Sequence, residues 1–170
     1  MRLSDLLHPD RVAIIHAADA TPPGAPARVA RPTAAFDKAA ALSQLATMLA
    51  SGARVTAADL ERVLLERESL QSTGIGDGVA IPHGAMPQLE AQYAALLLVP
   101  EGVEFAAIDG LKVTILFAVI GPKRATGEHL KTLARISRLL RNKEFRDRLI
   151  HSPDAKSAYA LVDEEEGDHR

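Results

Sequence analysis

Residues 74–84 read Gly-Ile-Gly-Asp-Gly-Val-Ala-Ile-Pro-His-Gly, and they form the most informative stretch of this 170-residue chain. Within it, residues 79–81 are apolar and partly β-branched, which is typical of a short buried strand. His83 follows that strand after a single proline. Reactive side chains in α/β proteins favour strand ends, because the sheet positions them while the loop leaves them exposed. We therefore expect His83 to be the working centre of the protein.

Three alternating glycines precede this histidine, at positions 74, 76 and 78. The backbone N–H groups of such a segment can form a concavity that holds anionic oxygens. The same glycines are also ordinary turn formers, and the sequence leaves both interpretations open. An imidazole is a good nucleophile at neutral pH, because its ordinary pKa is about 6.5. Together these features predict a phosphoryl group carried covalently on His83 and bound by Gly76, Asp77 and Gly78.

Two further side chains are candidates for the same site. His129 lies at the start of a predicted helix; with Thr126 as the N-cap, the helix dipole would keep its ring neutral. A neutral ring can donate one N–H to a phosphoryl oxygen. Arg67 closes another predicted helix just ahead of the glycines, where a guanidinium would neutralise phosphate oxygens. For each residue, the alternative is a solvated side chain at a helix end.

Outward from this stretch, the chain predicts one α/β domain. Strands are expected at residues 12–15, 79–81, 93–99 and 113–120, a loop at 71–78, and helices at 36–49, 56–69, 143–150 and elsewhere in the last third. The runs at 93–99 and 113–120 are almost continuously apolar, which indicates a sheet covered on both faces. The order β-α-α-β-β-β-α-α-α therefore predicts a three-layer α/β/α sandwich around a small mixed sheet.

The predicted domain spans residues 1–163. A proline-rich insertion interrupts it at residues 17–33, and a charged, frayed tail is expected at the C-terminus, over residues 164–170. The insertion is interpreted as surface filler, with a partner-specific loop as the alternative.

Composition excludes several function classes. The net charge is −2, from 20 basic and 22 acidic residues, so nothing draws the chain onto nucleic acid. Cysteine is absent, which excludes disulfides and thiolate metal sites. His83, His129 and Asp77 lack metal-binding spacing, and neither metal nor cofactor is expected. Without a signal peptide or a run of about 20 apolar residues, we expect a cytoplasmic protein that does not insert into membranes.

Residues 65–84 resemble the signature of the enzyme IIA family of the phosphoenolpyruvate-dependent phosphotransferase system, in its mannitol/fructose type. The resemblance continues through Phe-Ala-Ala-Ile-Asp-Gly at 105–110 and His-Leu-Lys-Thr-Leu-Ala at 129–134. Two segments are most similar to the nitrogen-regulatory branch of that family: the opening Leu-Ser-Asp-Leu-Leu at 3–7 and the sequence of residues 67–78.

The resemblance implies roles for the candidate residues. His83 would accept a phosphoryl group from the histidine-containing phosphocarrier protein, His129 would be the second active-centre histidine, and Arg67 would lie near the phosphate. The chain would then be a phosphotransferase-system component with a phosphohistidine intermediate, acting as a relay. Its phosphorylation state would regulate partner proteins, such as potassium-transport or sensor-kinase components. The alternatives are a sugar-specific enzyme IIA that passes phosphate to a IIB domain, and a binding module of the same fold that is never phosphorylated.

Overall fold

The structure is a computed structural model that describes residues 2–16 and 36–168. The insertion predicted at residues 17–33 lies outside the described residues. Within them, six strands form one mixed sheet in the order β1-β5-β6-β3-β2, with β4 also paired to β6. The strands are β1 (Val12–Ile14), β2 (Gly74–Gly76), β3 (Val79–Ala80), β4 (His83–Met86), β5 (Tyr93–Val103) and β6 (Val113–Pro122).

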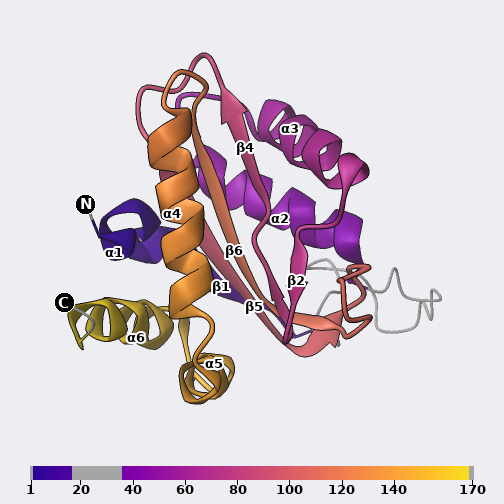
Figure 1. Cartoon of the computed structure of the whole chain (residues 1–170), viewed down its shortest axis with the longest axis vertical. Helices are drawn as coiled ribbons and strands as arrows, with labels where there is room; N and C mark the ends of the chain where they lie inside the picture. Colours follow the sequence, from indigo (N-terminus) through magenta and orange to yellow (C-terminus); the bar gives the residue numbers. More distant parts are fainter. Residues whose placement is uncertain (1, 17–35, 169–170) are drawn as a thin grey trace, which may run out of the picture.

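Helices cover both faces of this sheet (Figure 1). One face carries α2 (Lys38–Ala50) and α3 (Ala57–Leu70); the other carries α1 (Leu3–Leu7), α4 (Thr126–Leu139), α5 (Lys143–Ile150) and α6 (Ala155–Asp168). Successive side chains of the central strands alternate between two cores: Leu97 and Leu116 face α2 and α3, whereas Leu96 and Phe117 face the opposite helices. The predicted three-layer sandwich is confirmed.

The central strands explain why the sheet is so well defined. β5 and β6 run antiparallel, while β1 pairs parallel to β5 and both β3 and β4 pair parallel to β6. Because both faces are covered, these strands are buried along nearly their whole length. The helices predicted at 36–49 and 56–69 are also confirmed, and Thr56 caps α3 through Oγ1, which accepts from the N–H of Asp59 at 3.1 Å.

The loop predicted at residues 71–78 is partly wrong. Residues 74–80 form a hairpin, in which β2 and β3 are joined by Asp77 and Gly78 with φ angles of +56° and +79°. Positive φ at both central positions matches the twist of the flanking strands, which is why Asp-Gly suits a two-residue hairpin turn. Local composition favours a loop here, and the hairpin is stabilised instead by pairing of β3 with β6.

A further strand, β4, begins at His83 itself and was not predicted. Pro82 has no N–H for the sheet, so the chain breaks there and pairs again with β6 from His83 to Met86. Gly84 lets α3 pack closely on this strand: a Cβ at Gly84 would lie 2.5 Å from Cγ1 of Val63. Strand β4 therefore holds His83 on the sheet rather than on a free loop.

The prediction of a frayed tail from residue 164 is wrong as far as residue 168. That segment is the end of α6, which lies beside α1 (Figure 1). The Glu166 side chain is only 8% exposed, and its carboxylate accepts from the N–H groups of Leu3 at 2.6 Å and Ser4 at 2.9 Å. These N–H groups have no partner within the first turn of α1, so the two ends of the described chain stabilise each other.

Among the described residues, no helix is both long enough and apolar enough to cross a membrane.

Replacing Glu166 tests the contact between the two ends. Glu166→Ala should lower the free energy of unfolding by about 1–2 kcal/mol, because two buried N–H groups lose their acceptor. The matched control is Glu164→Ala on the exposed side of α6, which should change it by less than about 0.5 kcal/mol. Urea denaturation measures both variants, and equal effects would contradict the assigned role of Glu166.

Candidate functional site

His83 is the first residue of β4, and its ring is held by the chain just before it. Nδ1 lies 2.7 Å from the carbonyl oxygen of Ile81. A carbonyl oxygen only accepts hydrogen bonds, so Nδ1 carries the proton and donates it. Nε2 of a neutral ring then has the free lone pair. The backbone of β3–β4 thus selects which nitrogen of His83 is nucleophilic.

Arg67 lies at that nucleophilic nitrogen. It belongs to the last turn of α3, and its Nε donates to Nε2 of His83 at 3.3 Å. Its Nη1 donates to the carbonyl oxygen of Gln71 at 2.9 Å, which anchors the guanidinium at the end of the helix. The structure therefore brings together His83 and Arg67, both candidates from the sequence, and leaves guanidinium N–H donors beside Nε2.

His129 approaches the same ring from the other face of the sheet. Its ring centroid lies 5.7 Å from that of His83, with a tilt of 52° between the planes. His129 is in the first turn of α4, as predicted, but the N-cap is Ala125 rather than Thr126, whose hydroxyl instead donates to the Lys123 carbonyl oxygen. Nδ1 of His129 is buried near Gly121 and has no hydrogen-bond partner among the described residues.

Both imidazoles are kept neutral by their surroundings. Burial lowers the pKa of His83; the hydrogen bond to Ile81 raises it, the charge of Arg67 lowers it, and the charge of Glu68 raises it by a smaller amount. Burial also lowers the pKa of His129, and the neighbouring His83 lowers it further. With both pKa values below the ordinary value for histidine, His83 presents a free lone pair at neutral pH.

The structure does not bring Gly76, Asp77 and Gly78 to His83, although all were predicted to bind the phosphoryl group. The Gly78 carbonyl accepts from Ile115, whereas His83 pairs with Val119, four residues further along β6. At about 3.3 Å per residue, these four residues of β6 separate Gly78 from His83 by roughly 13 Å. Figure 1 accordingly shows β2 toward the lower end of the sheet and β4 toward the upper end.

One backbone N–H of the turn already has an acceptor within the protein: the N–H of Asp77 donates to Oδ2 of Asp109 at 2.9 Å. Of the two interpretations left open by the sequence, the structure thus supports turn formation for these glycines.

Two groups around His83 were missed by the sequence analysis. The first is the Ile81 carbonyl, for which residue types give no signal because any residue supplies a backbone oxygen. The second is Glu68, which is buried beside Arg67. A signal for Glu68 does exist: Leu60, Leu64 and Glu68 are spaced four apart, which places a carboxylate on the apolar face of α3. A buried acid at such a position needs a cation and hydrogen-bond donors around it.

Comparison with known proteins shows the family to which the chain is similar. Residues 26–165 match the family described as "Phosphoenolpyruvate-dependent sugar phosphotransferase system, EIIA 2". A "Nitrogen regulatory protein" of Bradyrhizobium diazoefficiens is 38% identical over 125 residues, which cover 74% of this chain and 82% of that protein. Another "Nitrogen regulatory protein", from Pseudomonas aeruginosa, is 40% identical over 99 residues, 58% of this chain and 64% of that protein.

A solved structure extends the similarity to three dimensions. The crystal structure of nitrogen regulatory protein IIA-Ntr from Neisseria meningitidis aligns with a TM-score of 0.77 at 27% identity, covering 94% of this chain and 98% of that one.

Titration of His83 tests the electrostatics of the site. We expect a pKa below the ordinary value of histidine, and we expect Arg67→Gln to raise it, because the variant removes a positive charge beside Nε2. Arg62→Gln is the matched control: it removes an exposed arginine of the same helix and should leave the pKa unchanged. Histidine ring chemical shifts followed by NMR against pH measure all three proteins. An identical pKa in wild type and Arg67→Gln would contradict the assigned contact.

Proposed function

The chain belongs to the EIIA 2 family of the phosphoenolpyruvate-dependent sugar phosphotransferase system, and we propose that Nε2 of His83 is the atom through which it relays phosphoryl groups. The observation that carries this proposal is the pair of contacts on one ring: Nδ1–H donates to Ile81 while Arg67 faces Nε2. A nucleophile of defined tautomer and a cation for the incoming oxygens are what this transfer needs most.

The proposed transfer needs no general base, because the attacking nitrogen of His83 carries no proton. The Nε2 lone pair of His83 forms a bond to phosphorus while the bond between phosphorus and the donor's imidazole nitrogen breaks. The donor ring, protonated at its other nitrogen, keeps that electron pair and leaves as a neutral imidazole, and its positive charge passes to the ring of His83. The Nδ1 proton stays in its hydrogen bond to Ile81 throughout. As the phosphoryl group arrives, Arg67 exchanges its contact with Nε2 for contacts with the phosphoryl oxygens. Reversal of the same steps passes the group on.

His129 is proposed to bind the phosphoryl group from the opposite side. Its ring lies beside that of His83, and burial of its Nδ1 leaves Nε2 as the nitrogen that donates to a phosphoryl oxygen. A neutral ring suits this task, since it supplies one N–H without requiring a second proton to be bound or released. The lowered pKa of His129 supports this assignment.

The donor in this proposal is the histidine-containing phosphocarrier protein, and the output is regulatory. The relatives described as nitrogen regulatory proteins support a role in that branch, with the phosphorylation state of His83 controlling partner proteins in the cytoplasm. Phosphorylation adds about two negative charges to a half-buried site, which changes the surface that partners meet. Leu130, next to His129 and 60% exposed, supplies apolar surface at the rim for such partners.

Reconstitution of the relay tests the proposal. The protein is incubated with phosphoenolpyruvate, the general first enzyme and the phosphocarrier, and acid-labile, base-stable phosphate is quantified. Wild type should acquire one phosphoryl group, His83→Ala none, and Arg67→Ala should react roughly 100-fold more slowly because charge neutralisation is lost. The control is His151→Ala, which removes an exposed histidine at the C-terminal end of α5 and should react as wild type. An adduct that persists in His83→Ala would contradict the proposal.

A further inference from the structure

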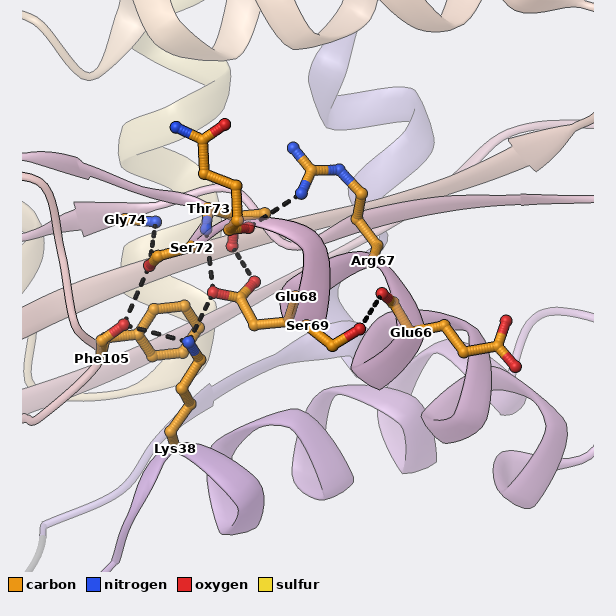
Figure 2. Close-up of polar contacts among 10 residues, drawn as sticks. Lys38, Glu66, Arg67, Glu68, Ser69, Ser72, Thr73, Gly74 and Phe105 are labelled. Atoms are coloured by element: carbon orange, nitrogen blue, oxygen red, sulfur yellow. Dashed lines mark hydrogen bonds and ion pairs between the residues drawn. The ribbon is translucent and has the colours of Figure 1, made fainter.

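Glu68 is a buried carboxylate that the chemistry proposed above does not use. It is the neighbour of Arg67 in the last turn of α3, and its side chain is only 4% exposed. Figure 2 shows it between Lys38, at the start of α2, and Thr73, in the segment that follows α3. Removing a carboxylate from water costs several kcal/mol unless hydrogen bonds and an opposite charge compensate. The arrangement around Glu68 supplies both.

Both oxygens of Glu68 are paired. Oε1 accepts from Nζ of Lys38 at 2.8 Å and from the N–H of Thr73 at 2.9 Å, and Oε2 accepts from the hydroxyl of Thr73 at 2.6 Å. Lys38 also donates to the Phe105 carbonyl oxygen at 3.2 Å and lies 4.6 Å from the centre of that ring. A positive charge gains nothing from the dipole at the first position of a helix, so these contacts account for a lysine there.

Thr73 links this network to the reactive ring. Its carbonyl oxygen accepts from the N–H of Ile81 at 3.0 Å, and the carbonyl oxygen of Ile81 accepts from Nδ1 of His83 at 2.7 Å. One continuous chain of hydrogen bonds therefore runs from Lys38 through Glu68, Thr73 and Ile81 to His83. At Thr73 and at Ile81 the donating and accepting groups belong to different peptide units joined through Cα, so the chain couples the positions of these residues.

The same segment also fixes Arg67. Residues 71–73 form hydrogen bonds with two side chains at the end of α3. The Gln71 carbonyl oxygen accepts from Nη1 of Arg67, and the N–H and hydroxyl of Thr73 both donate to Glu68. These contacts tie both groups that flank the His83 ring, the Ile81 carbonyl at Nδ1 and the Arg67 guanidinium at Nε2, to one short segment of chain. If that segment shifts, both contacts change together.

We propose that Glu68, held by Lys38 and Thr73, is a positioning residue for phosphoryl transfer, which keeps residues 71–73 in the one arrangement that orients His83 and Arg67. This inference rests on the proposed function of His83. Glu68 touches neither the reacting nitrogen nor the phosphoryl group in this account. It acts through Thr73 and Ile81, and its effect should appear in the tautomer of His83 and in the rate of transfer at saturating donor.

The Thr73→Val and Thr73→Ser pair tests this with minimal change in volume. Valine removes the hydroxyl that donates to Glu68 and leaves Oε2 unpaired, whereas serine keeps the hydroxyl. In Thr73→Val we expect the ring ¹⁵N shifts of His83 to move from a single Nδ1–H tautomer toward a mixture, and the transfer rate at saturating phosphorylated phosphocarrier to fall roughly 10- to 100-fold. The KM for the phosphocarrier should stay unchanged, and Thr73→Ser should restore both readouts.

Glu68→Gln supplies an independent variant with a signed outcome. An amide accepts through one of its two end atoms only, so one of the donors from Lys38 and Thr73 loses its acceptor, and the tautomer of His83 and the transfer rate should change in the same direction as in Thr73→Val. Val162→Ala, in the core of the other sheet face, is the control for general destabilisation and should change neither the tautomer nor the rate.

The two proposals fail in different ways. If wild type acquires no phosphate on His83, the proposed function falls. If wild type is phosphorylated on His83 but Thr73→Val keeps the wild-type tautomer and rate, only the positioning role of Glu68 is overturned. Equal changes in Thr73→Val and Val162→Ala would likewise overturn it, because the effect would then follow stability rather than the hydrogen-bond chain.

Discussion

The hydrogen bond from Nδ1 of His83 to the Ile81 carbonyl is the interaction on which the rest of the site depends. Because a carbonyl cannot donate, this one contact decides the tautomer and leaves Nε2 to react. The Ile81 carbonyl lies in the break between two stretches of the chain that pair with β6, the first ending at Ala80 and the second beginning at His83. Arg67, His129 and burial then act on a nucleophile whose reactive nitrogen is already chosen.

The sandwich explains how residues distant in sequence meet at that ring. Helices α3 and α4 pack on opposite faces of the sheet, and each ends or begins near the edge where β4 starts, so Arg67 and His129 reach His83 from two sides. β5 and β6, buried on both faces, make the support rigid. Burial disfavours the charged form of His83 and of His129 and so lowers the pKa of each. This favours the neutral rings that phosphoryl transfer requires.

Some of this was predictable from sequence, and some was not. The long apolar runs predicted β5 and β6, the capped amphipathic segment predicted α3, and His83, Arg67 and His129 were singled out before any geometry. Gly76, Asp77 and Gly78 were predicted to bind the phosphoryl group, and only the register of β3 and β4 on β6 reveals that they lie far from His83. The end of α6 and the role of Glu68 were missed for a similar reason: their charges are paired by partners elsewhere in the chain.

The central claim is that Nε2, and not Nδ1, carries the phosphoryl group. Long-range ¹H–¹⁵N spectra of the ¹⁵N-labelled, phosphorylated protein identify the modified nitrogen directly through its coupling to ³¹P. We expect coupling at Nε2 of His83 together with an Nδ1 shift typical of a protonated, hydrogen-bonded nitrogen. Coupling at Nδ1 would contradict it, because the proton held by Ile81 would then have to leave before the phosphoryl group could bind.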